Sequence, residues 1–380
     1  MHSLEKGSER AHKAETSSSF SFLRHLKEKK KTKKTTTTTK SSKVTAAPTH
    51  SPTKDTAAPT PKPTLPKKPG EDDVNSFTFQ GNSFQNLPIN ITGVYLLKAL
   101  GAQGGVAITD CGTVYPGGFG TLMQGQFYLS AGDKLTIAVG GKGGDADAPG
   151  RCGGGGGSTS IVSEKLGILL VAGGGGGAAN VDCTREYVLV KGGFNATIEQ
   201  NGVDGDAGAS GGCPNGGGGL GGVGGVGGGI FYSQYGGAGG AGYYGDGGTH
   251  CGKCEGKGID PESCDGSYNV ISYGGQALLS GNYGGCCNTA ATCDICLSCG
   301  GFGGGGQSGA TGSKDQVCGG GGGGGYSGGG GGGGGFLAGN GGGGGSINTS
   351  SLHKNDTVAT DSVYDETGNG YASIQFWSSS

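Results

Sequence analysis

The stretch from Cys318 to Ser346 constrains the fold more than any other, because glycine fills almost all of it. Its interruptions are Tyr326-Ser327, Phe336-Leu337-Ala338 and Asn340. Glycine has no side chain to bury and loses more backbone entropy on folding than any other residue. Such a run is therefore either a flexible linker or a structure ordered by backbone contacts alone. Large aromatic residues and leucine are what a flexible linker avoids, so the sequence favours the ordered alternative.

Backbone contacts can order glycine as packed polyglycine II helices, which are extended rods with about three residues per turn. Rods without Cβ atoms can approach closely enough to exchange N–H to C=O hydrogen bonds laterally. Collagen is excluded because the sequence has no strict Gly-X-Y period. Since 89 of the 95 glycines lie between residues 100 and 346, short glycine motifs carry little information. None of the three Gly-Lys pairs is followed by Ser or Thr, so we discard a nucleotide-binding P-loop.

Residues 1–75 have a different character. The first 70 residues contain 16 Lys and Arg against 5 Asp and Glu, while the rest of the chain is acidic. The Lys/Thr/Pro-rich composition lacks the apolar content that folding requires, and it predicts a disordered basic segment. A solvated linker is the favoured interpretation over a nucleic-acid-binding tail, a nuclear signal or an O-glycosylated stalk, so we expect no nucleic-acid partner.

No apolar segment near Met1 has the length of a signal peptide, and none in the chain reaches the roughly 20 apolar residues of a membrane span. The expectation is therefore no membrane span in this chain. Either the chain is not secreted, or it is a fragment or begins at a wrongly assigned start; the cysteines and sequons described below favour the second alternative.

Short runs of β-forming residues bracket the glycine-rich region and predict an all-β domain over residues 76–378. Residues 125–129 and 134–139, joined by the turn Ser130-Ala131-Gly132-Asp133, predict a hairpin with alternating burial. The expected fold is a jelly-roll-like β-sandwich, with strands at about 76–172 and 370–377 and glycine-rich insertions between them. The other expected strands are 76–79, 94–100, 159–162 and 167–172.

Several ordered blocks carry a resemblance to a known family. They are Phe77 to Gly81, Ala99 to Gly105, Leu135 to Gly144, Leu170 to Gly177 and residues 319–345. Together they resemble the glycine-rich extracellular domain of the anaplastic lymphoma kinase and leukocyte tyrosine kinase receptors, over about residues 76–377.

The resemblance implies a jelly-roll-like sandwich fused to a polyglycine II bundle that binds protein ligands. The chain departs from the family because it has no kinase signature, no membrane span and no downstream cysteine-rich module. No ligand-contact residue is carried over for that reason. Phage adhesins with polyglycine sandwich tips are similar in architecture alone.

All thirteen cysteines follow residue 110. The spacings Cys251-x2-Cys254 and Cys293-x2-Cys296-x2-Cys299 are compatible with zinc or an iron–sulfur cluster. Disulfides are favoured over metal, because loop-rich segments that cannot build a core are commonly cross-linked, and an odd count leaves one thiol free or paired between chains. The disulfide candidates, with pairing left open, are Cys111, Cys152, Cys183, Cys213, Cys251, Cys254, Cys264, Cys286, Cys287, Cys293, Cys296, Cys299 and Cys318.

Four Asn-x-Ser/Thr sequons accompany the cysteines, at Asn90, Asn195, Asn348 and Asn355. Such sequences accept N-linked sugars in secreted proteins, where they lie on exposed turns. Cysteines and sequons together favour an extracellular or cell-surface location.

No catalytic constellation is recognisable. Outside the basic segment the histidines are His250 and His353, and neither lies next to a nucleophile. The Asp145/Asp147 and Asp204/Asp206 pairs are interpreted as solvated turn residues, and the second lacks the later glutamate of a calcium loop. We therefore expect no enzyme activity, no cofactor and no metal, unless a missing C-terminal part carries a kinase. Aromatic residues set in glycine could stack on sugars or on side chains of a partner, but we favour a role in covering the edges of the glycine region. These residues are Tyr232, Tyr235, Tyr243, Tyr244, Tyr326 and Phe336.

Two functions remain open from the sequence. The first is an extracellular recognition domain that binds a protein ligand or a cell-surface partner. The second is a structural or adhesive glycine-rich surface or matrix protein without a dedicated ligand. An intracellular zinc-binding or nucleic-acid-binding protein ranks last.

Overall fold

The computed structural model describes residues 74–180, 192–208, 218–230, 235–251, 270–286, 298–309, 317–335 and 338–378. The chain divides between Asp72 and Asp73, and every described residue belongs to the second part. The basic segment predicted to be disordered, residues 1–75, therefore lies outside the described residues except for its last two. These two belong to the first strand, which begins at Val74 rather than at residue 76.

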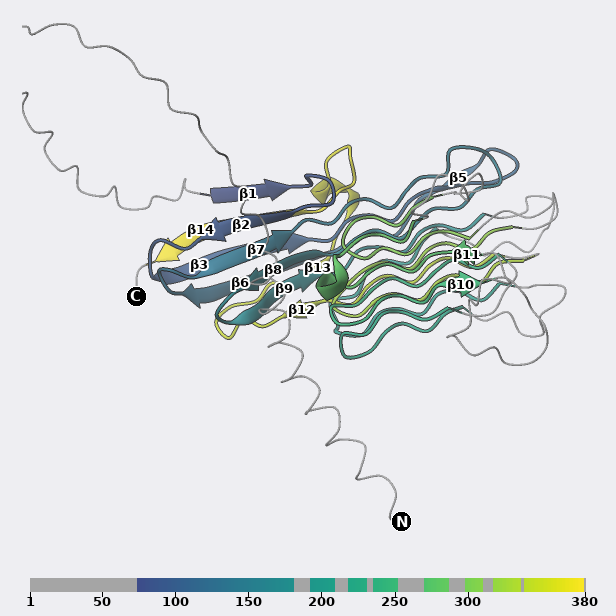
Figure 1. Ribbon diagram of the computed structural model, residues 1–380. Coiled ribbons are helices and arrows are strands. Elements are labelled where there is room, and N and C mark those ends of the chain that lie inside the picture. Colours follow the sequence, from purple (N-terminus) through teal and green to yellow (C-terminus); the bar gives the residue numbers. More distant parts are fainter. Residues whose placement is uncertain are drawn as a thin grey trace, which may run out of the picture. The chain divides into compact units, whose positions relative to one another are not determined.

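Two five-stranded antiparallel sheets form the conventional part of the fold (Figure 1). The first sheet has the order β1 (Val74–Thr78), β14 (Tyr371–Ser378), β3 (Gly93–Leu100), β6 (Thr121–Leu129) and β13 (Thr357–Val358). The second has the order β12 (Ile347–Asn348), β9 (Gly167–Ala172), β8 (Thr159–Ser163), β7 (Lys134–Ala138) and β2 (Phe84–Pro88). The predicted all-β class is confirmed.

The remaining elements are short. They are the strand pairs β4 (Ala107–Ile108) with β5 (Val114–Tyr115) and β10 (His250–Cys251) with β11 (Val270–Ser272), and the 3-10 turns η1 (Leu278–Ser280) and η2 (Asp361–Val363).

A hydrophobic core lies between the two sheets, because alternate residues of each strand face inward. On β3 the inward residues include Tyr95 and Leu97, and on β6 they include Met123 and Phe127. Leu97 is fully buried. Burying each large apolar side chain contributes about 1.5–3 kcal/mol, so this core supplies the hydrophobic stabilisation that glycine cannot.

The predicted hairpin of residues 125–139 is wrong in its pairing, although both strands exist. β6 pairs with β3 and β13, whereas β7 pairs with β2 and β8 in the other sheet. The turn crosses between the sheets at Gly132, which adopts a φ of 78°, and at Asp133, whose buried carboxylate accepts a hydrogen bond from Ser163. The two strands face each other across one core, and both show alternating burial. Two strands paired in a hairpin would show the same pattern, so the pattern alone cannot distinguish the two arrangements.

β2 is a strand that was not predicted from the sequence, and it ends at a proline. Pro88 is the last residue of an edge strand, a position that tolerates proline since its missing N–H is not needed by a second neighbour.

The glycine-rich segments between residues 101 and 346 run side by side beyond the strand ends and form what we call the glycine array (Figure 1). Segments far apart in the sequence are neighbours within it, since the chain enters the array after β3, β7 and β9 and leaves it before β12.

Hydrogen bonding in the array repeats every three residues. In residues 328–333 consecutive N–H groups point to different neighbouring segments, and every third N–H returns to the same neighbour. The donor–acceptor pairs are Gly328 to Val226, Gly329 to Gly323, Gly330 to Val203, Gly331 to Gly229, Gly332 to Gly320 and Gly333 to Asp206, at 2.8–3.0 Å. The carbonyls of the same residues accept bonds from further segments, so this stretch is bonded to neighbours all around it.

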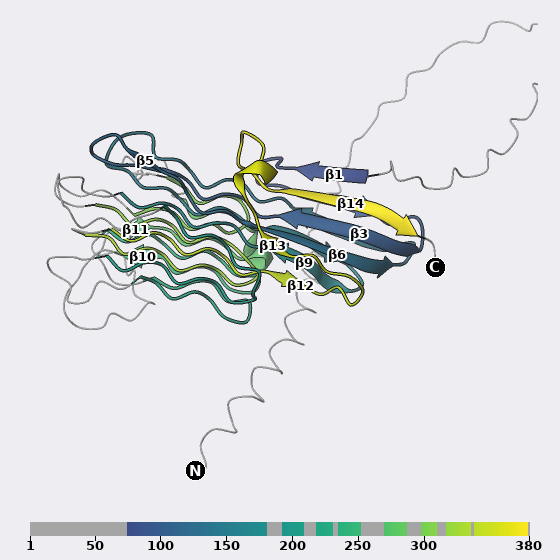
Figure 2. The same ribbon diagram turned by 180° about the vertical axis from the view of Figure 1, so that it is seen from behind.

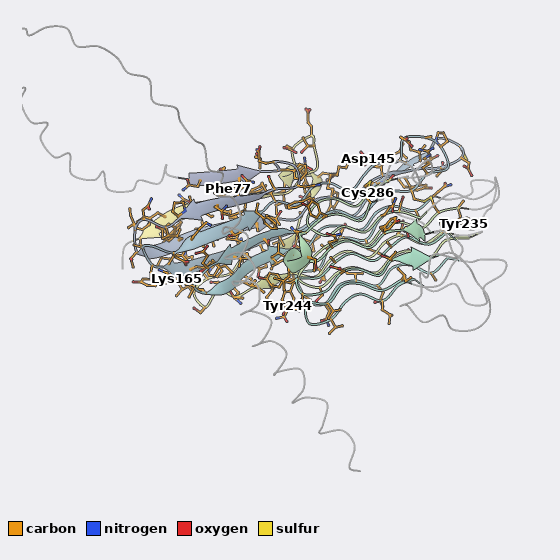
Figure 3. All side chains as sticks on the ribbon, viewed as in Figure 1. Phe77, Asp145, Lys165, Tyr235, Tyr244 and Cys286 are labelled. Carbon is orange, nitrogen blue, oxygen red and sulfur yellow. A yellow bond between two sulfur atoms is a disulfide. The ribbon has the colours of Figure 1, made fainter. Side chains whose placement is uncertain are left out.

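Aromatic residues join the array to the outer face of the second sheet. Tyr243 and Tyr326 are buried there and pack with Val162 and Val171 of β8 and β9. Tyr244 lies at this junction, while Tyr235 lies toward the opposite end of the array (Figure 3). Of the six predicted residues, Tyr243, Tyr244 and Tyr326 cover the array at its junction with the sandwich, and Tyr235 does not belong to this cluster. Tyr232 and Phe336 lie outside the described residues.

Candidate binding surfaces

Most glycine positions inside the array have no space for a side chain. A Cβ atom at Gly331 would lie 2.1 Å from the carbonyl oxygen of Gly237, and one at Gly322 would lie 2.2 Å from that of Gly329. Both distances are far below van der Waals contact. Any chemistry of this domain must therefore come from surface side chains, from the loops, or from the few positions where a polar residue interrupts a glycine run.

Two disulfides have both partners in the described residues. Cys152–Cys318 links positions 166 residues apart inside the array, and both cysteines are fully buried. Cys286–Cys299 closes a shorter loop, and Cys111 is also disulfide-bonded. Figure 3 marks Cys286 among the glycine segments. Stable disulfides are typical of oxidising surroundings such as the cell exterior.

The remaining cysteines cannot be placed. The side chain of Cys251 and the residues Cys183, Cys213, Cys254, Cys264, Cys287, Cys293 and Cys296 lie outside what the structure describes.

The metal site considered as an alternative for the Cys293-x2-Cys296-x2-Cys299 spacing would lack one of its ligands. Cys299, the last cysteine of the Cys293-x2-Cys296-x2-Cys299 spacing, is bonded to Cys286 and has no thiolate to offer. Within the described ranges no cluster of three His, Cys, Asp or Glu side chains has a geometry that holds a metal ion.

The four sequons have different surroundings. Asn90, Asn195 and Asn355 are exposed. Asn348 is 9% exposed, and its Nδ2 donates hydrogen bonds to the Gln124 carbonyl at 2.9 Å and to Asp356 at 2.8 Å. A sugar on Asn348 would require both bonds to be broken.

The carboxylates of the first acidic pair are exposed, as predicted, and each also has a specific partner. Asp145 accepts the N–H of Val106 and pairs with Lys142 at 2.7 Å, while Asp147 pairs with Arg151. Figure 3 marks Asp145 on the array part of the domain. These carboxylates stabilise turns.

The second acidic pair is similarly engaged. Asp204 accepts the N–H of Gly221 at 2.7 Å, and Asp206 accepts a bond from Asn340 Nδ2 at 3.2 Å. The two carboxylates have different partners, as expected for side chains spaced by two on a threefold rod and not for a calcium loop.

Tyr364 fixes the loop after β13 to the array. Its hydroxyl donates to the Gly101 carbonyl at 2.7 Å and accepts from the Gly120 N–H at 2.8 Å. Burial raises the pKa of Tyr364 well above its ordinary value, because an ionised phenol would lose its hydration there. The ring also stacks on Phe119, with centroids 6.1 Å apart.

The outer face of the first sheet is a candidate binding surface. Figure 2 shows this sheet in front, with β14, β3 and β6 side by side. Trp377 is 56% exposed and Tyr128 is 49% exposed. Tyr128 pairs with Val94 of β3, and Trp377 precedes Ser378, which pairs with Val94 from the other side after an irregularity in the register. Large aromatic side chains on an uncovered face are characteristic of recognition surfaces.

A groove of about 560 Å³ continues this face toward the array. Its floor includes Ser76, Thr78 and Tyr371 of β1 and β14, and its wall includes Asp365 and Thr367 of the loop after η2. Thr367 donates to Asp365 through both its N–H and its hydroxyl, which fixes the wall. The groove therefore offers hydroxyl and carboxylate groups beside the aromatic residues Phe77, Phe79 and Tyr371.

A second groove, of about 490 Å³, lies where the array meets the 116–119 segment. Phe119 and Phe194 line it together with Asn195, Asp206 and Asn340. Asn340 is 2% exposed, and its Oδ1 accepts the N–H of Ala179 at 3.0 Å. The sequence marked Asn340 as an interruption of the glycine run, but only the fold brings it next to Asp206 and Asn195.

Neither groove was predicted. The alternation of β14 places Trp377 on the face opposite Ile374, so the exposure of Trp377 could have been inferred once the strand was assigned. The grooves could not, because their walls come from segments separated by many residues.

Among the residues that the structure describes, no helix is long and apolar enough to cross a membrane. His353 is exposed, while the side chain of His250 lies outside the described set. The chain matches no protein-family model and shows no significant similarity to curated proteins.

Proposed function

We propose that this protein is an extracellular or cell-surface recognition domain, similar in kind to the ligand-binding ectodomain of a receptor tyrosine kinase, whose partner is a protein ligand or a cell-surface component. The buried Cys152–Cys318 bridge supports the oxidising location. No step of the proposal involves a cofactor or a catalytic residue.

We also infer the finer architecture. The three-residue repeat of lateral hydrogen bonds around residues 328–333 supports a bundle of polyglycine II helices. The two antiparallel sheets packed on one core, joined by turns that cross between sheets, support a jelly-roll-like sandwich.

The observation that carries the proposal is the outer face of the first sheet. A sheet that faces solvent normally presents polar residues, whereas this one exposes Trp377 of β14 and Tyr128 of β6. Aromatic residues are enriched among the residues that dominate binding energy at protein interfaces. The packed sandwich and the array hold this face rigid, which reduces the entropy lost on binding.

Binding by the secreted full chain to a panel of extracellular proteins and cell surfaces tests the proposal. We expect saturable binding to a subset of the panel, and we expect Trp377→Ala combined with Tyr128→Ala to weaken it at least tenfold, which corresponds to about 1.4 kcal/mol. Leu166→Ala is the control, because Leu166 is 59% exposed but lies on the β8–β9 turn. Uniform weak binding that the double variant does not change would contradict a recognition function.

A second candidate function, lateral adhesion between copies, is supported by the edge of the array. Leu220, Val223 and Val226 are 70%, 63% and 54% exposed. The N–H groups of Leu220 and Val223 have no partner among the described residues. An apolar edge with free backbone donors resembles the edge strand of a sheet, which promotes association unless it is protected.

Analytical ultracentrifugation separates the two functions. If the protein is adhesive, the chain should associate with itself at higher concentration, and Leu220→Ser and Val223→Ser should abolish this association. If the protein is a recognition domain, the same substitutions should leave partner binding in the panel assay unchanged.

A further inference from the structure

The groove beside the array contains a sequon asparagine, and this coincidence suggests what fills it. Asn195 belongs to Asn195-Ala196-Thr197 and lines the groove directly after Phe194. Its Oδ1 accepts the N–H of Phe119 at 2.8 Å, which fixes the orientation of the amide. Its Nδ2, the atom to which an N-linked sugar attaches, has no partner among the described residues.

The lining of the groove matches the chemistry of a sugar. A pyranose has an apolar face of C–H groups and a rim of hydroxyls, so it suits an aromatic ring beside hydrogen-bonding side chains. Phe194 and Phe119 are partly exposed and supply the rings. Asp206 and Asn340 supply the polar wall, and the Asp206 Oδ1 has no protein partner in the described part of the chain.

The polar wall is preorganised. Asn340 interrupts a glycine run, is almost fully buried, and is held by the Ala179 N–H on one side and by Asp206 on the other. Asn340 thus stands where the neighbouring positions are glycine, and its side-chain amide holds the Asp206 carboxylate at the groove through a hydrogen bond. Array packing alone does not require this residue.

The other sequons lack such a setting. Asn90 and Asn355 are exposed but line neither groove, and the amide of Asn348 is consumed by two protein hydrogen bonds. Asn195 therefore combines an accessible amide with a neighbouring seat for the sugar.

We propose that Asn195 carries an N-linked glycan whose first residues pack into the groove formed by Phe119, Phe194, Asp206 and Asn340. The donor is a lipid-diphosphate-linked oligosaccharide of the secretory pathway. A bond forms between Nδ2 and the anomeric carbon of the first N-acetylhexosamine, the bond from that carbon to the phosphate oxygen breaks, and the amide proton leaves to the transferase base. The inference rests on the extracellular function proposed above, because the donor exists only in secretory compartments.

The test uses the full chain behind a cleavable secretion signal, produced in insect cells and, without sugar, in a bacterial periplasm. Glycopeptide mapping should find Asn195 modified. Enzymatic release of the sugar from the native protein should be markedly slower at Asn195 than at Asn355, and the two rates should become equal after denaturation. The glycosylated protein should have a thermal midpoint a few degrees above that of the unglycosylated protein.

Variants separate the sugar contact from the protein scaffold. Asn195→Gln should abolish the difference in thermal midpoint between the two preparations, whereas Asn355→Gln should leave it intact. Phe194→Ala keeps the sequon, so it should preserve occupancy but speed the native release of the sugar. Comparing each variant with and without sugar removes the effect of the lost Asn195–Phe119 hydrogen bond.

The outcomes are distinguishable. If Asn90 or Asn355 is modified while Asn195 is not, the inference fails and the extracellular function stands. If the Asn195 sugar is released as fast as the Asn355 sugar, the groove is not its seat and the inference fails. If the secreted chain carries no sugar at any sequon and its cysteines are free thiols, the proposed extracellular function fails with it.

Discussion

A pair of glycine-to-alanine substitutions tests whether backbone contact alone orders the array. Gly331 donates its N–H to the carbonyl of Gly229 at 3.0 Å, so the two residues are partners in one hydrogen bond. A Cβ at Gly331 would lie 2.1 Å from the Gly237 oxygen, whereas a Cβ at Gly229 has its nearest neighbour at 3.5 Å, the Leu220 oxygen. Replacement of glycine by alanine is therefore sterically forbidden at Gly331 and makes only ordinary van der Waals contacts at Gly229.

The magnitude follows from the contacts. Relieving the Gly331 clash requires a neighbouring segment to move by about 1 Å, which breaks roughly two buried backbone hydrogen bonds at about 1–3 kcal/mol each. Alanine returns about 0.4–1 kcal/mol by restricting the unfolded chain. We expect Gly331→Ala to lower the free energy of unfolding by about 2–5 kcal/mol, and Gly229→Ala to be neutral or stabilising by up to about 1 kcal/mol.

Thermal or urea unfolding followed by circular dichroism measures both variants. A domain of this size shifts its thermal midpoint by about 2 °C per kcal/mol, so the two variants should differ by roughly 4 °C or more. Equal midpoints, or a stabilised Gly331→Ala, would refute the reasoning, because they would mean that the segment tolerates a side chain as a flexible linker does. Gly322→Ala repeats the test, with its Cβ 2.2 Å from the Gly329 oxygen.

Three further predictions use the same unfolding assay. Replacing Cys152 and Cys318 together by serine should cost about 2–5 kcal/mol, because the bridge closes a loop of 166 residues; an unchanged midpoint would contradict a structural role for it. Burial raises the pKa of Tyr364 in the folded protein, so this tyrosine ionises at a lower pH in the unfolded chain than in the folded one. Its contribution to the free energy of unfolding is therefore fully present below about pH 10 and is lost as the pH rises above that value. Stability should fall there by up to about 1.4 kcal/mol per pH unit for this residue, and Tyr364→Phe should flatten the decline; an unchanged decline in Tyr364→Phe would contradict the assignment. Asn340→Ala should cost about 1–3 kcal/mol because it leaves the Ala179 N–H unpaired and buried, whereas full stability in this variant would remove the case for a fixed polar wall in the groove.

Much of the sandwich could be predicted from the sequence, because segments such as 94–100 and 127–129 are short runs of apolar, β-forming residues. The pairing of β6 and β7 could not be predicted. Two adjacent strands with the same alternation fit one sheet or two facing sheets equally well, and the choice depends on distant partners such as β3 and β8. β2 was missed because its Pro88 is tolerated only by its edge position.

The site was less predictable than the fold. Exposed sequons and cysteines are recognisable by type, yet the burial of Asn348 and the pairing of Cys299 with Cys286 depend on contacts that the sequence does not encode locally. Asn195 and Asn340 are separated by well over a hundred residues in the sequence, yet both line the second groove. They do so because segments that are neighbours in the array are far apart in the sequence. Interruptions of the glycine run were the available signal, since a polar residue at such a position needs a partner.

The same interruptions explain how so repetitive a sequence specifies one structure. A glycine rod can slide along its neighbours by whole three-residue steps and recover every backbone hydrogen bond, so glycine alone leaves the register undefined. Side chains remove this freedom. The hydroxyl of Ser327, fully buried, accepts the N–H of Gly225 at 3.0 Å, and the methyl group of Ala241 occupies the space over Gly304, where an added Cβ would meet it at 2.8 Å. A slipped rod would bring these groups against backbone oxygens instead, at the same distances that forbid alanine at Gly331. The register is therefore set by the scarce residues that are not glycine, and the stability of the array by the glycines between them.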